Sequence, residues 1–72
     1  MRQFGDLEAV VMDHLWSNGE PLTVREVLER IDRDRPLAYT TVLTVMDNLH
    51  RKGFLTREKA GRAFRYQPSK DR

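Results

Sequence analysis

The chain has 72 residues, of which 39% are hydrophobic and 33% are charged, and it contains no cysteine. A chain of this length forms one small domain that buries about 60% of its unfolded surface. The lack of cysteine excludes disulfides and thiolate metal sites. Because no apolar run approaches the roughly 20 residues of a membrane span and no signal peptide precedes the domain, we expect a soluble, cytoplasmic module.

The net charge of +2 is distributed unevenly along the sequence. Residues 1–22 carry a net charge of −3, residues 23–38 are neutral, and residues 39–72 carry +5. A basic C-terminal half is typical of a protein that presents one face to a polyanion. The alternative is an ordinary solvated surface, and the charge asymmetry alone leaves both interpretations open.

Two segments have the hydrophobic spacing of amphipathic helices. The first covers residues 6–18, with acids in its first turn and Asn18-Gly19 at its end. The second covers residues 23–33, where Thr23 and Glu26 have the spacing of a capping box and Pro36 closes the segment. The apolar stripes consist of Leu7, Val10, Val11, Met12, Leu15 and Trp16 in the first helix and Val24, Val27, Leu28 and Ile31 in the second.

Residues 39–52 begin with a run of β-branched residues, YTTVLTV, which by composition favours a strand. As a strand, however, neither face would be cleanly apolar. As a helix, one stripe is apolar, and Gly53 supplies a stop after two basic residues. We therefore predict a third helix, in which Val42, Val45, Met46 and Leu49 face the core and Thr40, Thr41, Leu43, Thr44 and Asp47 face outward.

Alternation with period two follows the third helix. We expect strands at residues 54–59 and 63–67, joined by a turn at Ala60-Gly61 and ended by Pro68. A two-residue stretch near Leu22 is a candidate third strand beside this hairpin. We expect residues 1–68 to form the domain, and polar residues 69–72 to have no partner in this chain and to begin a linker.

Three helices followed by a β-hairpin are the layout of a winged helix-turn-helix, which is an α+β fold. In this fold the outward face of the third helix enters the DNA major groove. Threonine hydroxyls can bond phosphates or base edges, and methyl groups can contact thymine. We therefore predict DNA contacts at Thr40, Thr41, Leu43 and Thr44. The alternatives are that Thr40 or Thr41 caps the helix, and that Leu43 is a lone exposed leucine.

The hairpin adds three cationic candidates for DNA contacts. Arg62 follows the turn and is placed to reach phosphate or the minor groove. Arg57 and Arg65 flank it and face the DNA backbone. The alternative is a solvated edge hairpin that its charges protect against aggregation. We assign the aromatic residues to core or hairpin packing; they are Trp16, Phe54, Phe64 and Tyr66.

Catalytic and metal sites have little support in the sequence. His14 and His50 lie on different helices, with no carboxylate or cysteine constellation and no metal-ligand spacing. No glycine-rich phosphate loop follows a strand. We therefore expect neither an enzyme nor a bound metal or cofactor.

Three segments of the chain resemble one known family. They are LEAVVMDHLW in the first helix, YTTVLTVMDNLHRKGFL through the third helix, and GRAFRYQP in the hairpin. Over residues 4–68 the chain is similar to the BlaI/MecI/CopY family of penicillinase repressors, and most of all to its actinobacterial BlaI-type members. The resemblance implies a transcriptional repressor of β-lactamase and related genes, with DNA contacts on the first half of the third helix and around Arg62.

The resemblance also implies partners. Family members are cytoplasmic homodimers that bind palindromic operators in double-stranded DNA, and a β-lactam-triggered membrane sensor protease leads to their cleavage. We expect these 72 residues to be the DNA-binding half, with the dimerisation region and the cleavage site in a C-terminal region missing here. The alternative function is a winged-helix protein–protein interaction module. The acid Asp47 on the outward face is compatible with this alternative.

Overall fold

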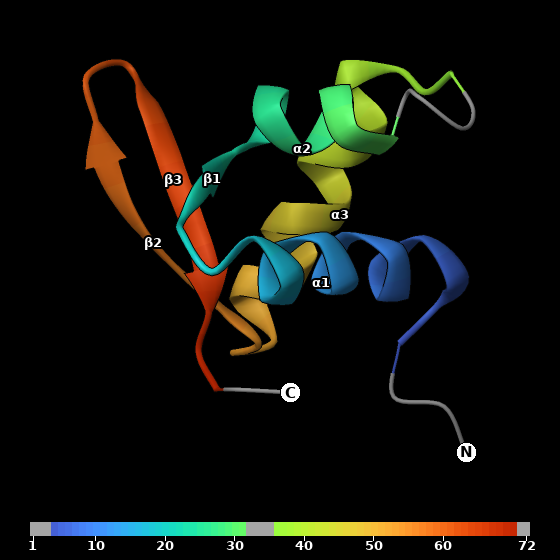
Figure 1. Cartoon of the computed structure of the whole chain (residues 1–72), viewed down its shortest axis with the longest axis horizontal. Coiled ribbons are helices and arrows are strands. Elements are labelled where there is room, and N and C mark those ends of the chain that lie inside the picture. Colours follow the sequence, from blue (N-terminus) through green and yellow to red (C-terminus); the bar gives the residue numbers. More distant parts are fainter. Residues whose placement is uncertain (1–3, 32–35, 71–72) are drawn as a thin grey trace.

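In the computed structural model, which describes residues 4–31 and 36–70, three helices pack together and a small antiparallel sheet lies against one side of them (Figure 1). This arrangement confirms the winged helix-turn-helix that the sequence predicts, and β1 is the third strand expected near Leu22. The elements are α1 (Asp6–Asn18), β1 (Leu22–Thr23), α2 (Val24–Ile31), α3 (Tyr39–Arg51), β2 (Leu55–Ala60) and β3 (Ala63–Pro68). The end of the predicted second helix, residues 32–33, lies outside the described residues.

The start of α2 is fixed by the capping box that the sequence predicts. The Glu26 backbone N–H donates to Thr23 Oγ1 at 3.1 Å, and the Thr23 backbone N–H donates to Glu26 Oε1 at 2.9 Å. Two N–H groups that the helix itself cannot pair are thereby satisfied. This hydrogen bond from the Thr23 backbone is the main reason why the pKa of the Glu26 carboxyl is lowered, and the charge of Arg65 lowers it further.

The lowered pKa of Glu26 predicts a loss of stability in acid. Its folded-state pKa lies below its unfolded value, so the stabilisation is complete above about pH 4.3 and is lost as the pH falls through the folded pKa. Replacing Glu26→Gln should make the unfolding free energy less dependent on pH below about pH 5, in urea titrations at several pH values. Glu29→Gln, at an exposed position of the same helix, is the control; equal slopes for both variants would contradict the capping role.

The end of α3 is a Schellman motif centred on Gly53. The Phe54 N–H donates to the Leu49 carbonyl at 2.9 Å and the Gly53 N–H donates to the His50 carbonyl at 3.1 Å. Gly53 has φ of 88°, a conformation that residues with a Cβ adopt only with strain. The predicted glycine stop is confirmed, and the turn leads the chain directly from α3 into β2.

The sheet has the strand order β1-β3-β2, with all neighbours antiparallel. The predicted turn at Ala60-Gly61 is wrong by one residue, because Ala60 pairs with Ala63 and the loop is Gly61-Arg62. Gly61 has φ of 66°, and no residue other than glycine has a positive φ in the described part of the chain. A positive φ at the first loop position only is the pattern of a type II′ turn, which requires glycine there. We call the β2–β3 hairpin the wing.

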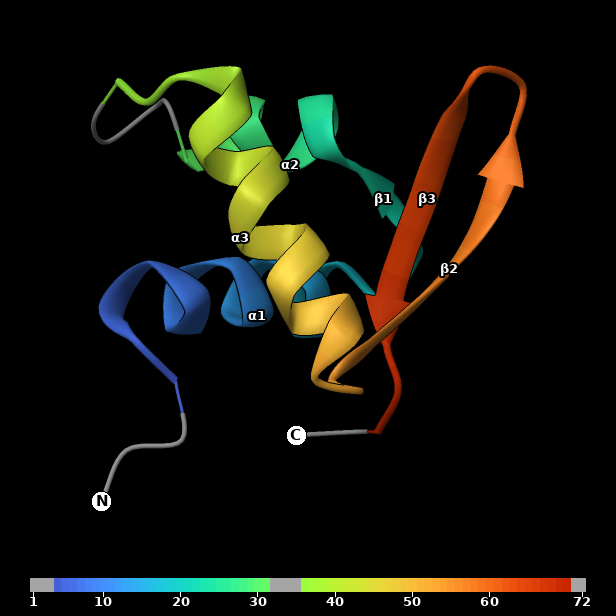
Figure 2. The same cartoon turned by 180° about the vertical axis from the view of Figure 1, so that it is seen from behind.

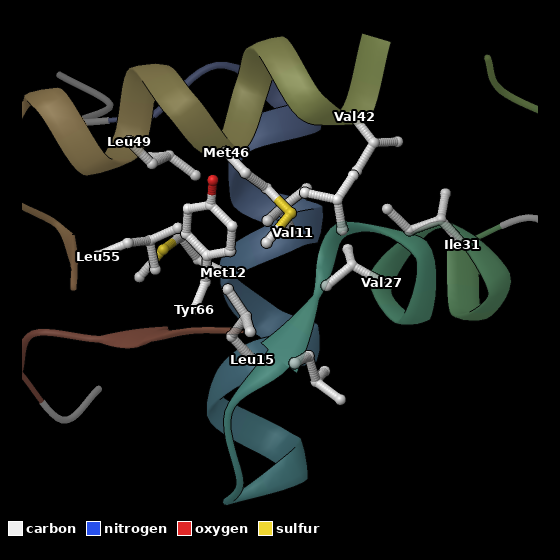
Figure 3. Close-up of a cluster of buried hydrophobic side chains, with 12 residues drawn as sticks. Val11, Met12, Leu15, Val27, Ile31, Val42, Met46, Leu49, Leu55 and Tyr66 are labelled. Atoms are coloured by element: carbon white, nitrogen blue, oxygen red, sulfur yellow. The ribbon is translucent and has the colours of Figure 1, made fainter. Parts of the chain in front are cut away.

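The core lies where the three helices meet the inner face of the sheet (Figure 3). The apolar stripes predicted from the spacing supply most of it, although Leu7, Val10, Trp16, Leu28 and Val45 are only partly buried at its edge. The buried residues are Val11, Met12, Leu15, Leu22, Val24, Val27, Ile31, Val42, Met46, Leu49, Leu55 and Tyr66. The core therefore fixes which face of α3 points outward.

Residues 69 and 70 are bound to the domain, contrary to the expectation that they have no partner. The Ser69 hydroxyl donates to the Gly53 carbonyl at 2.7 Å, and the Trp16 indole N–H donates to the Lys70 carbonyl at 3.0 Å. Trp16 in turn packs edge-on against Phe4, with ring centroids 6.4 Å apart. That a linker follows these residues stays a prediction. Over residues 4–31 and 36–70, no helix is long and apolar enough to cross a membrane.

Candidate nucleic-acid interface

The first half of α3 presents short polar side chains to solvent. Thr40, Thr41 and Thr44 are exposed, and Leu43 between them retains 38% of its accessible surface. The N-cap is Ala38, and no side chain caps the helix. Within the described residues none of the three threonine hydroxyls has a hydrogen-bond partner, so the alternative that Thr40 or Thr41 caps the helix is wrong. These hydroxyls are available to an external ligand.

The second half of α3 carries one acid, Asp47, whose charge is balanced by two arginines. Arg51, one turn further along the helix, donates to Asp47 at 2.6 Å, and Arg57 from β2 lies 3.6 Å from the other carboxylate oxygen. The hydrogen bond from Arg51 is the main reason why the pKa of the Asp47 carboxyl is lowered. Asp47 therefore remains ionised at neutral pH inside a group with a net positive charge.

Arg57, a predicted DNA contact, extends from β2 of the wing and contacts both β3 and α3. Its guanidinium lies 4.3 Å from the centroid of the Phe64 ring, and it donates to the Tyr66 hydroxyl at 3.3 Å. Tyr66 is buried, and its hydroxyl points toward α3 (Figure 3). Together with the Asp47 ion pair, these contacts connect β2 and β3 to the outward face of α3. Phe64, assigned to packing, remains 39% exposed beneath Arg57.

The two other wing arginines lie in different places. Arg62 is exposed in the two-residue loop and has no ion pair within the described residues. Arg65 is exposed opposite Glu58 in the register, and its charge lowers the pKa of Glu26. Because strand residues alternate between faces, Arg65 lies on the opposite face of β3 from Tyr66. The structure brings Arg62, but not Arg65, into a cleft with Tyr39 and Leu43 of α3.

A cleft of about 330 Å³ separates the first half of α3 from the wing. Tyr39 and Leu43 line it from α3, and Arg62 and Phe64 line it from the wing. The wing loop and the start of α3 lie at the same edge of the molecule, which both views of the chain show (Figures 1 and 2). We call this hollow the wing cleft.

Sequence reasoning missed Arg25 and Tyr39 as members of this surface. Arg25, at the start of α2, lines the wing cleft, and its guanidinium lies 5.8 Å from the centroid of the Tyr39 ring. Tyr39 is 43% exposed. The hydrophobic spacing of α2 puts Arg25 on the polar side of the helix, but only the packing of α2 against α3 places it beside Tyr39.

The comparison with known families decides the relationship of the chain. The family model described as "Penicillinase repressor" matches residues 4–72. The chain belongs to the penicillinase repressor family. This confirms the family expected from the sequence, which is a family of repressors and not of enzymes. The basic wing and the exposed threonines thus belong to a member of this family.

A curated member of the family is similar over most of this chain. The chain is 50% identical over 68 residues to the transcriptional regulator BlaI of Mycobacterium tuberculosis, a match that covers 94% of this chain and 49% of that protein. The chain thus spans about half the length of the curated relatives it matches.

Two solved structures of BlaI have the same fold. The DNA-binding domain of the repressor BlaI matches with a TM-score of 0.84 and 30% identity, covering 96% of this chain and 83% of that one. The monomeric form of Bacillus licheniformis BlaI in complex with the blaP half-operator matches with a TM-score of 0.78 and 30% identity, covering 97% and 84%. Both matches confirm the winged helix-turn-helix fold of this member of the penicillinase repressor family.

Proposed function

We propose that the chain is a DNA-binding repressor domain that recognises an operator half-site through the outward face of α3. The observation that supports this most is the set of free threonine hydroxyls on the exposed face of α3, beside Leu43, which lines the same cleft as Arg62. Short side chains allow the helix backbone to lie deep in a major groove about 12 Å wide. A relative in the same family, BlaI of Bacillus licheniformis, has been solved with a half-operator, which supports the same ligand here.

The predicted contacts then take different roles. Thr40, Thr41, Leu43 and Thr44 meet base edges, thymine methyl groups and nearby phosphates in the major groove. Arg62 binds phosphate or enters the minor groove from the tip of the wing. Arg65 approaches the DNA backbone from the outer face of the wing. Arg57 acts indirectly, because it balances the charge of Asp47 and holds the wing against α3.

The rest of the regulatory cycle is proposed from the family resemblance. We infer a cytoplasmic homodimer, formed through a C-terminal region beyond these residues, that binds a palindromic operator and represses β-lactamase and related genes. A sensor protease would then relieve repression by acting on that region. The match to only 49% of the Mycobacterium tuberculosis BlaI leaves room for such a region in the relatives.

Substitutions at Arg62 and Thr44 test the proposed interface. An operator is first selected from random duplexes, and binding is then measured by fluorescence anisotropy at several salt concentrations. Arg62→Gln should weaken binding to every duplex and reduce the slope of log K against log salt by about 0.9, because one phosphate contact is lost. Thr44→Ala should instead lose about 1 kcal/mol of discrimination at one base pair, with the salt slope unchanged.

Lys70→Gln is the control for a change of charge, because Lys70 lies in the segment bound to α1, at the opposite edge of the molecule from the wing loop and the start of α3 (Figure 1). Should both test variants bind like this control, the assigned face of α3 is wrong. Should the unmodified chain show no salt-dependent affinity for any duplex, the protein–protein interaction module is the better explanation.

A further inference from the structure

The wing cleft combines an apolar floor with unpaired positive charge at its rim. Leu43, Phe64 and the edge of Tyr39 supply the apolar surface, and they are the exposed large hydrophobic residues of the described chain. Arg25 and Arg62 are exposed and enter the cleft from two different elements. An apolar floor between two arginines suits a ligand with alternating apolar and anionic groups.

The charge around the cleft is of one sign. No acidic side chain lines it, and neither Arg25 nor Arg62 has a carboxylate partner within the described residues. Glu26, which follows Arg25 in α2, accepts a hydrogen bond from the Thr23 N–H as part of the capping box. The other arginine near this surface, Arg57, is paired with Asp47. The two free arginines therefore determine the electrostatic character of the wing cleft.

Tyr39 holds Arg25 in position before any ligand binds. The guanidinium lies over the ring at 5.8 Å, a distance at which a cation is attracted to the face of an aromatic ring. This contact limits the conformations of a side chain that otherwise loses entropy when it binds, so less affinity is lost on ordering it. The N–H groups of the arginine remain free to donate to phosphate oxygens.

We propose that the wing cleft binds one stretch of the sugar–phosphate backbone of duplex DNA, with Arg25 and Arg62 on successive phosphates and the deoxyribose on the apolar floor. This assignment rests on the proposed function and adds Arg25 as a contact and Tyr39 as the residue that positions it. The cleft adjoins Leu43 on the major-groove face, so the same strand can continue from one surface to the other. Its contribution to binding is independent of sequence.

The experiment measures the affinity of the chain for a mixed-sequence duplex by fluorescence anisotropy over a range of salt concentrations. Arg25→Gln should weaken binding roughly five- to tenfold near 0.1 M salt and reduce the salt slope by about 0.9, whatever the sequence of the duplex. Arg25→Lys should keep the salt slope but bind less tightly than arginine, since it keeps the charge without the planar stacking group. Lys70→Gln, which removes a charge elsewhere, is the matched control.

Variants of Tyr39 separate positioning from direct contact. Tyr39→Phe keeps the ring and should bind like the unmodified chain, whereas Tyr39→Leu should weaken binding with an unchanged salt slope. In the Arg25→Gln background, Tyr39→Leu should have little further effect, because the residue it positions is gone. Equal losses for Tyr39→Phe and Tyr39→Leu would overturn the role given to the ring.

The outcomes also separate this inference from the proposed function. If Arg62→Gln weakens DNA binding but Arg25→Gln behaves like Lys70→Gln, the backbone does not pass through the wing cleft and only this inference fails. If the unmodified chain shows no salt-dependent binding to duplex DNA, the proposed function fails as well. Both arginine positions are exposed, and thermal unfolding of each variant checks that the fold is retained.

Discussion

Replacing Met46→Ala should remove a large part of the domain's stability, about 2 to 5 kcal/mol. Met46 has no accessible surface and lies on the inner face of α3, among the side chains of the core (Figure 3). Truncation loses the transfer free energy of its side chain and leaves a cavity that close-packed neighbours fill only partly. A domain of this size has only about 4 to 11 kcal/mol in total, so the unfolding midpoint in urea should fall steeply.

Leu43→Ala is the matched control for Met46→Ala, three residues earlier on the same helix. Leu43 is 38% exposed, so its truncation should change the unfolding free energy by about 0.5 kcal/mol or less. The contrast tests which face of α3 is buried, on which the proposed interface depends. Similar losses for the two variants would mean that the helix is rotated, so that the threonines are not on the outward face.

The sequence alone was sufficient to predict α3, because the buried residues of this segment recur at the spacing of a helix. Val42, Met46 and Leu49 recur at helical spacing and are fully buried, and the same rotation puts Thr40 and Thr44 outside. Strand propensity was the weaker signal, because it counts β-branched residues without regard to face. Local signals also located the Thr23 capping box and the Gly53 stop, since each depends on residues close in sequence.

Features that depend on contacts between distant residues could not be predicted. The ion pair of Arg57 with Asp47 joins two elements whose relative placement no local pattern specifies. The same holds for Arg25 over Tyr39. The hairpin turn was wrong by one residue because AGRA offers two positions for a two-residue loop. Gly61 has φ of 66°, which favours glycine at the first loop position, and the loop is therefore Gly61-Arg62.

Arg57→Gln should weaken DNA binding roughly five- to tenfold, the size expected for one positive charge near the phosphates. On our interpretation the loss is indirect. Asp47 would keep only Arg51 as a partner, and so would repel the DNA more strongly, while the wing would lose its connection to α3 through the Tyr66 hydroxyl.

The double variant Asp47→Asn with Arg57→Gln separates an indirect role from a direct contact. It has the same net charge as the unmodified chain, because one acid and one base are removed together. If Arg57 mainly balances the charge of Asp47, anisotropy titrations should show that the double variant recovers most of the affinity lost in Arg57→Gln. Asp47→Asn alone should then bind more tightly than the unmodified chain. If Arg57 itself contacts phosphate, as the sequence suggested, the double variant should remain weak and its salt slope should stay lower by about 0.9. The unfolding free energy of each variant, measured in urea, shows how much of any loss comes from a less stable wing.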